Sequence, residues 1–195
     1  MIFESKKYSV LIVSSSEKMN DSFKGILPLT KYAPVTFVNS ISSAKRAVLD
    51  SFFDFVIINT PLKDDFGTDF AIELCRKKSS VCLIMVKSEV YDKINYQVTP
   101  YGVFTISKPT SVSSMEMALN WLASARERTI ANDRKKESIE DKMKEIRIIN
   151  RAKWLLIENL KMNEAEAHRY IEKQAMDTCV SKITVAEDIL KTYQK

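Results

Sequence analysis

The sequence predicts an α/β half built on a parallel sheet, joined by one long helix to a small all-α bundle. Three observations lead to this prediction. Short apolar runs alternate with amphipathic segments up to about residue 110, neither proline nor glycine occurs after Pro109, and further amphipathic segments follow residue 160. Runs that are apolar on both faces and separated by helices are typical of a parallel sheet covered on both sides.

Apolar runs of strand length occur at five places in the first half, and each is expected to form a strand: 8–13, 35–38, 55–58, 81–86 and 103–106. The segments between them have helical spacing of apolar residues, most clearly at 41–49 and 70–75 and more weakly at 90–96. Ser14 and Glu17 are expected to cap the first helix. Five such units make a doubly wound, flavodoxin-like sheet, whose functional edge lies at the carboxyl ends of the strands.

Composition limits the classes of function. The 195 residues fit one ordinary domain and a small one. No apolar run approaches the roughly 18 residues that span a bilayer, and residues 1–13 lack a secretory pattern, so we expect a cytoplasmic protein without a membrane partner. Scattered cysteines and a single histidine favour reduced thiols, no metal site and no cofactor. The net charge of +5 permits binding to nucleic acid without requiring it.

Polar motifs follow three of the expected strands: LIVSSSE, DFVIINTPLKDDFG and ISKP. Over about residues 6–125 these motifs resemble the receiver domain of response regulators. In that family the corresponding places hold an acidic pair that binds magnesium, a phosphoryl-accepting aspartate followed by a proline loop, and a lysine before a proline. The resemblance therefore implies a signal transduction protein of the two-component type.

The chain departs from the receiver pattern at the residues that carry its chemistry. Ser14 and Ser15 replace the acidic pair, Asn59 replaces the aspartate, Lys87 stands where a threonine or serine is usual, and Lys108 is kept. An amide is not an anionic nucleophile, and hydroxyls are poor ligands for magnesium. These five residues, here called the degenerate site, predict a pseudo-receiver with no catalytic residue and no aspartyl phosphorylation.

Two alternatives stay open for this half. Asp64 or Asp65 could accept a phosphoryl group, although each is more simply explained as a solvated loop carboxylate. The degenerate site could hold a small anion, or its polar groups could satisfy one another.

A long helix is expected from residue 113 to 160, with Ser113 and Glu116 as its capping box. Its charged residues 126–138 are expected to form a solvated helical linker. Beyond them lies a stripe that predicts either a solvated helix or a short coiled coil between two protomers, with the asparagine setting the register. The stripe comprises Ile139, Met143, Ile146, Ile149 and Asn150. A homodimer is therefore an expected partner.

Two capping boxes follow the long helix, Asn163 with Glu166 and Thr184 with Glu187, and each predicts a helix. With the end of the long helix they make a three-helix bundle over residues 139–195. So small a bundle has little core of its own, so we expect support from the long helix or from a dimer partner.

Several short motifs of the bundle have a recognisable spacing: Arg151-Ala152-Lys153, Leu155-Leu156, Glu164-Ala165-Glu166-Ala167, Ile171, Ala175-Met176-Asp177 and Val185-Ala186. They resemble the ANTAR domain, an RNA-binding output module found behind bacterial receivers. The resemblance implies binding to paired hairpins in nascent transcripts and prevention of termination. Trp154 departs from the small residue usual after the Ala-Lys pair, and Glu172 stands where a basic residue is frequent.

Basic and aromatic residues of the bundle are the candidate RNA-binding set: Arg147, Arg151, Lys153, Trp154, Arg169, Tyr170, Lys173 and Lys182. Basic side chains contact phosphates, and the two aromatic side chains could stack on unpaired bases. Taken singly, each basic residue is more simply explained as solvated and each aromatic residue as core.

The expected domains are a receiver-like domain at 1–125, a linker at 126–138 and an ANTAR-like domain at 139–195. The predicted function is an RNA-binding antitermination regulator of the response-regulator type and not an enzyme. The alternatives are a DNA-binding regulator, or a dimeric scaffold whose pseudo-receiver responds to a ligand or a protein partner. A helix-turn-helix usually has a short, often glycine-containing turn, and no glycine follows Gly102.

Overall fold

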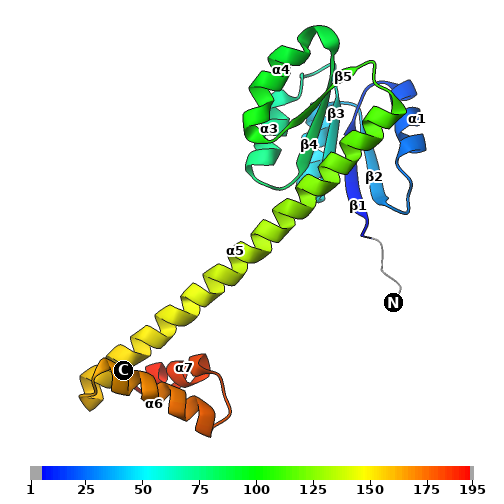
Figure 1. Cartoon of the computed structure of the whole chain (residues 1–195). Helices are drawn as coiled ribbons and strands as arrows, with labels where there is room; N and C mark the ends of the chain where they lie inside the picture. Colours follow the sequence, from blue (N-terminus) through cyan, green and yellow to red (C-terminus); the bar gives the residue numbers. More distant parts are fainter. Residues whose placement is uncertain (1–5, 194–195) are drawn as a thin grey trace. The chain divides into compact units, whose positions relative to one another are not determined.

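The structure, a computed structural model, describes residues 6–193 and divides into two compact units that meet between Ile130 and Ala131. Helix α5 (Val112–Leu160) runs through this boundary, so it contributes to both units (Figure 1). The outermost residues of the expected domains, 1–5 and 194–195, lie outside the described part. Each unit is therefore described by itself.

The first unit contains a five-stranded sheet in the order β2-β1-β3-β4-β5. The strands are β1 (Tyr8–Val13), β2 (Tyr32–Val38), β3 (Phe55–Asn59), β4 (Val81–Lys87) and β5 (Phe104–Lys108). Every neighbouring pair is parallel. This order and the parallel pairing confirm the doubly wound, flavodoxin-like prediction.

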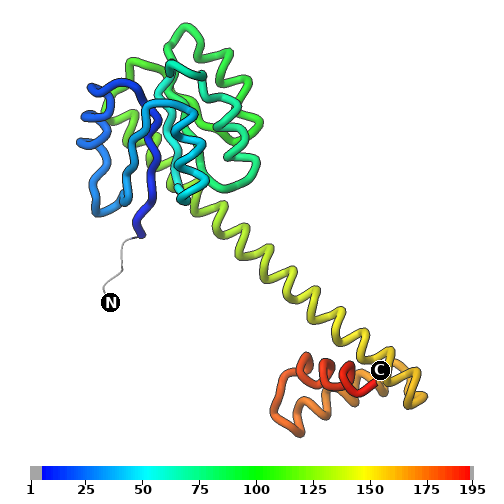
Figure 2. Tube along the Cα trace, turned by 180° about the vertical axis from the view of Figure 1, so that it is seen from behind, coloured from blue at the N-terminus to red at the C-terminus, as the bar shows by residue number. Residues whose placement is uncertain are grey.

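Both faces of the sheet are covered by helices: α1 (Glu17–Ile26), α2 (Ile41–Asp50), α3 (Thr68–Arg76), α4 (Tyr91–Val98) and the start of α5. Single turns η1 (Ser88–Val90) and η2 (Thr99–Tyr101) flank α4. Helices α2, α3 and α4 pack with Leu11 and Val56 on one face. Helices α1 and α5 pack with Ile12 and Ile57 on the other. The Cα trace in Figure 2 shows the helices on the two sides of the sheet. Successive strand residues thus enter opposite cores, as the pleat requires.

Three helices begin at a different residue from the one expected. The cap of α1 is Ser16, whose Oγ accepts from the amide of Met19 at 3.4 Å. Ser111 precedes α5 and accepts from the amide of Ser114, and Ser181 precedes the last helix and accepts from the amide of Thr184. In each case a serine two or three residues away takes the role, downstream for α1 and upstream for the other two helices, because several neighbouring hydroxyl residues fit the same capping pattern.

The second unit is formed by the end of α5 with α6 (Glu164–Asp177) and α7 (Lys182–Tyr193). The capping box of Asn163 and Glu166 is present, with backbone-to-side-chain bonds of 2.8 and 2.9 Å. Fully buried Ala152, Ala167 and Ala186 lie where the helices pack. Small side chains allow this close approach, which gives the bundle a core despite its size. Among the residues that the structure describes, no helix could span a membrane.

Candidate functional site

The carboxyl ends of β1, β3 and β5 bring three residues of the degenerate site into contact. Asn59 donates from Nδ2 to Oγ of Ser14 at 3.0 Å, and Lys108 donates from Nζ to Oδ1 of Asn59 at 2.7 Å. The ammonium also donates to the backbone carbonyl of Thr60. Ser14 and Asn59 are buried. The amide, hydroxyl and ammonium groups therefore form one hydrogen-bonded chain inside the site.

The other two members of the degenerate site lie at its exposed rim. Ser15 and Lys87 are exposed, and Lys87 is the register partner of Lys108 on the neighbouring strand. Burial and then the nearby charge of Lys87 lower the pKa of Lys108. Across residues 6–193, no group of three or more histidine, cysteine, aspartate or glutamate residues is arranged to hold a metal ion. The edge therefore presents positive charge where receivers of the usual pattern present carboxylates.

The two aspartates after β3 are engaged in local structure. Asp64 accepts from the amides of Ile41 and Ser42 at 3.1 and 2.9 Å, which lie in the first turn of α2. These contacts, that of the Ser42 amide first, lower the pKa of Asp64. Asp65 accepts from the amide of Gly67 at 2.6 Å. Both carboxylates thus hold the loop, in line with the simpler of the two explanations.

Gly67 closes this loop with a left-handed backbone, at φ +89°. A Cβ at this position would lie 3.0 Å from side-chain atoms of both Ile41 and Ile58. Glycine is therefore required by backbone conformation and by packing. The path of the loop is determined by the contacts that it makes with α2 and β3.

The candidate RNA-binding set lies on the second unit, and most of its members are exposed. The exposed members are Arg147, Arg151, Trp154, Arg169, Tyr170, Lys173 and Lys182. Trp154 is 70% exposed, so the explanation of this indole as core is wrong. Lys153 is the exception, because its side chain is only 15% exposed and its Nζ lies 3.1 Å from Oε1 of Glu164.

A cavity of about 290 Å³ lies beside this ion pair and is lined by Asn150, Lys153, Trp154, Ile157 and Glu164. Its lining includes Asn150, which was predicted for the dimer helix, and Lys153 and Trp154, which were predicted for RNA binding. Glu164 was not singled out from the sequence as a site residue. Its position in the first turn of α6, eleven residues after Lys153, gave no signal that the two side chains would pair.

Glu172 compensates part of the charge on α6 and α7. Lys182 donates to Oε1 of Glu172, and Nε2 of His168 lies 3.3 Å from that oxygen. The hydrogen bond from Lys182, followed by its charge, lowers the pKa of Glu172. A phosphate would therefore have to compete with Glu172 for Lys182.

The predicted dimer stripe is only partly continuous. Ile139, Met143 and Ile146 are each about half exposed, at 49%, 50% and 58%, and Asn150 is exposed. Ile149 is different, because it is partly buried and packs against the core of the bundle. The expectation that Ile149 belongs to the stripe is therefore corrected. It lies close to Ile146 on the helix surface, but α6 and α7 pack against α5 at this level.

Comparisons with known proteins bear on both units. Residues 137–190 match the ANTAR domain family. The transcriptional regulatory protein PdtaR of Mycobacterium tuberculosis H37Rv is 24% identical over 139 residues, which cover 71% of this chain and 68% of PdtaR.

Two solved structures resemble the first unit. A receiver domain of an HD domain-containing protein from Pseudomonas fluorescens Pf-5 has a TM-score of 0.57 at 17% identity, covering 66% of this chain and 95% of that one. A streptococcal protein, described as a redox sensor that evolved from two-component response regulators, has a TM-score of 0.56 at 21% identity, covering 64% and 55%. At this identity the likeness shows the fold alone.

The chain thus has a receiver-plus-ANTAR architecture. Its first unit has the receiver fold, and residues 137–190 match the ANTAR domain family. Members of both families are typically regulators without enzymatic activity. RNA binding follows from the ANTAR domain as the general property of that module.

Proposed function

We propose that the chain is a transcription antitermination regulator whose second unit binds hairpin RNA. The observation that carries this proposal is the ANTAR match over residues 137–190. The similarity to PdtaR, which is named a transcriptional regulatory protein, supports the regulatory role. An RNA target also suits a bundle that displays arginines, lysines and an exposed indole together.

Within that unit, the exposed basic side chains are the proposed phosphate contacts, and Trp154 is the proposed stacking platform. An indole that is 70% exposed leaves most of its surface open to a partner. Stacking of a base on an aromatic side chain is worth roughly 1–3 kcal/mol per base. Such stacking requires unpaired bases, and the loop of a hairpin provides them.

The chain is proposed to act as a homodimer through Ile139, Met143 and Ile146, with Asn150 setting the register. The spacing of four, three and four residues is that of a coiled-coil seam. Each of the three apolar side chains is about half exposed, so pairing would remove apolar area from water. Two joined bundles would also bind two hairpins, in agreement with the paired hairpins that the resemblance implies.

The receiver-like unit is proposed to act without aspartyl phosphorylation. Asn59 offers an amide to Ser14 and Lys108 where a receiver of the usual pattern offers a carboxylate to a phosphodonor. The signal would then arrive by another route, such as a ligand or a protein partner at this unit.

A binding assay with three probes tests the RNA proposal. The probes are hairpin RNAs selected from a pool with randomised loops, the same strands with the stem unpaired, and duplex DNA of equal charge, each in a salt series. We expect tightest binding to the intact hairpins at physiological salt. Phosphate contacts are common to all three probes, so such a preference would come from the paired stem and its loop. Equal affinity for all three would reject hairpin recognition and leave the dimeric scaffold as the function.

A further inference from the structure

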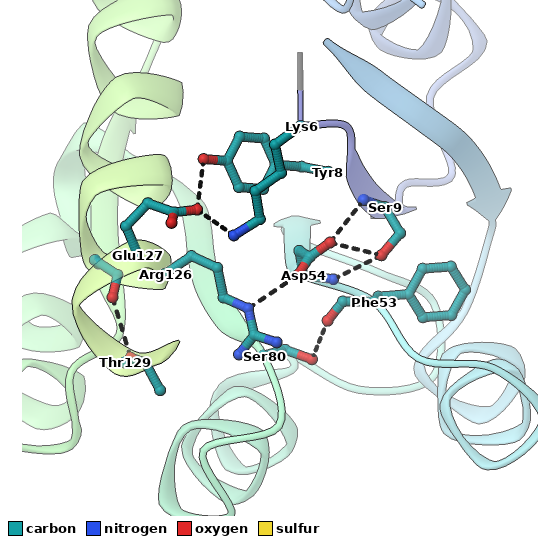
Figure 3. A network of polar contacts seen from close by, with 10 residues as sticks. Lys6, Tyr8, Ser9, Phe53, Asp54, Ser80, Arg126, Glu127 and Thr129 are labelled. Atoms are coloured by element: carbon teal, nitrogen blue, oxygen red, sulfur yellow. Dashed lines mark hydrogen bonds and ion pairs between the residues drawn. The ribbon is translucent and has the colours of Figure 1, made fainter. Parts of the chain in front are cut away.

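Helix α5 is attached to the amino-terminal edge of the sheet by a largely buried ion pair (Figure 3). Nε of Arg126 donates to Oδ1 of Asp54 at 2.9 Å, and the two side chains are only 11% and 14% exposed. The other carboxylate oxygen accepts from the amide and the hydroxyl of Ser9, at 2.9 and 3.1 Å. One carboxylate thus joins β1, the turn before β3, and α5.

A second contact lies one residue further along the helix. Glu127 accepts from the phenol of Tyr8 at 2.9 Å and from the ammonium of Lys6. The ring of Tyr8 stacks on Phe55 with centroids 4.8 Å apart, which holds the phenol in place. Burial and then the hydrogen bond to Glu127 raise the pKa of Tyr8 to about 12, so the phenol stays a donor at neutral pH.

The surroundings hold both partners of the buried pair in position. The guanidinium of Arg126 lies over the ring of Phe52, 4.8 Å from its centroid. Ser80 donates to the backbone carbonyl of Phe53 at 2.7 Å, which secures the turn that carries Asp54. The arginine is therefore held between a carboxylate and an aromatic face, a geometry that a lysine would not reproduce.

The position of these contacts along α5 gives them their importance. They lie within the last turn of the first unit, which ends at Ile130. Residues 131–147 of the same helix are exposed. Arg126 and Glu127 thus hold α5 to the sheet shortly before its exposed stretch begins. They also lie at the edge opposite to the degenerate site, whose residues follow the carboxyl ends of the strands.

We propose that α5 is held by a latch that consists of Asp54, Arg126, Tyr8 and Glu127. The latch opens at a lower free energy than global unfolding of the sheet, and its opening controls the connecting helix. A buried ion pair contributes little net stability compared with apolar packing, but loss of one partner leaves an uncompensated charge. Separation of the pair returns both charges to water, so opening costs little free energy compared with unfolding of the apolar core. The coupling of the latch to RNA binding, unlike the latch itself, depends on the proposed function.

Hydrogen exchange of the full-length chain tests the latch. In Arg126→Gln we expect amides of residues 120–130 to lose at least tenfold in protection, to the level of an exposed helix, while those of β3 and β4 still exchange slowly. Asp54→Asn combined with Arg126→Gln leaves no buried charge and serves if the single variant does not fold. Lys144→Met, which removes an exposed pair with Asp141 on the same helix, should change nothing in residues 120–130.

Two exchange results would overturn the latch. Unchanged protection of residues 120–130 in both Arg126 variants would mean that the ion pair does not hold the helix. Fast exchange spreading through β3 and β4 would mean that the pair belongs to the global core and has no opening of its own.

Reciprocity between the latch and RNA tests the coupling. Binding of a selected hairpin to the wild type should change the exchange of residues 120–130, and Arg126→Gln should change the hairpin affinity by at least threefold. Hairpin binding with neither effect would reduce the latch to a structural anchor and reject its control of the helix. If no hairpin binds the wild type, the proposed RNA function fails, and the exchange results alone decide the latch.

Discussion

Nζ of Lys108 lies 2.7 Å from Oδ1 of Asn59, so the lysine that receivers keep for an anion donates here to a neutral amide. The amide in turn donates to Ser14, which leaves the buried part of the site internally satisfied. A return of one residue to the receiver pattern, such as Asn59→Asp, would therefore disturb hydrogen bonds that are already satisfied. This relationship leads directly to a test of the pseudo-receiver.

We expect no phosphoryl adduct when the chain is incubated with a small-molecule phosphodonor and magnesium. Asn59→Asp alone should also give none, because Ser14 and Ser15 supply no carboxylate for the metal. Adding Ser14→Asp and Ser15→Asp should restore an acid-labile adduct, seen as added mass in the intact protein. An adduct on the unmodified chain would show that another residue accepts the group.

The contact of Asp64 with α2 predicts a pH-dependent contribution to stability. Because its pKa is lowered in the folded state, this contribution is present above the unfolded pKa of about 4 and is lost as the pH falls through the folded pKa. Asp64→Asn should therefore lower the thermal midpoint at pH 7 and have a smaller effect at pH 3, where part of this contribution is already lost. Asp21→Asn, which removes an exposed pair with Lys24, is the control. The same difference at both pH values would contradict the assignment.

Replacement of Ile146 with glutamate should shift the sedimentation profile from dimer toward monomer, because a charge would enter the proposed seam. Met176→Glu changes an exposed apolar residue of α6 outside the seam and should leave the profile as it was. Ile149→Glu should instead destabilise the bundle, since Ile149 packs against its core. A dimer that survives Ile146→Glu would place the contact between protomers elsewhere.

Arg151 and Lys153 should differ in their effect on RNA binding, although the sequence alone suggested equal roles. Arg151→Ala should lower affinity for all hairpins and reduce the salt slope by about one unit. Lys153→Ala should leave the salt slope nearly unchanged, because this lysine is largely covered and paired with Glu164. Fluorescence anisotropy across a salt series measures both, and equal slopes for the two variants would count against this distinction.

Trp154→Ala should weaken hairpin binding by about 1–3 kcal/mol without loss of thermal stability, because the indole is exposed and is proposed to stack on a base. Ile171→Ala serves as the opposite case. Its side chain is buried in the bundle, so its loss should cost about 2–5 kcal/mol of stability. Unchanged hairpin affinity in Trp154→Ala would exclude the indole as a platform.

The strands were predictable because each is an apolar run set apart by turn residues, as the run 55–58 illustrates with complete burial. The degenerate site was predictable for a related reason, since parallel strands bring Ser14, Asn59 and Lys108 to one edge. Helix starts were less certain, because Ser14 and Ser16 fit the same capping pattern and only one accepts the amide of Met19.

Other features depend on tertiary contacts that leave no local pattern. Asp54 and Arg126 are separated by 72 residues, and nothing in the local sequence of either residue indicates the other as its partner. The pairing of Lys153 with Glu164 depends on how α6 folds back on α5. Ile149 continued an apolar spacing that would have suited a seam, but it lies at the level of α5 where α6 and α7 pack.

The path of the loop after β3 is held by residues outside the degenerate site. Asp64 accepts from two amides in the first turn of α2, and Gly67 passes where a Cβ would meet Ile41 and Ile58. These anchors do not involve Ser14, Asn59 or Lys108, which bond one another. The side chains of the degenerate site can therefore change without loss of the loop, and the same scaffold stays available for another kind of input.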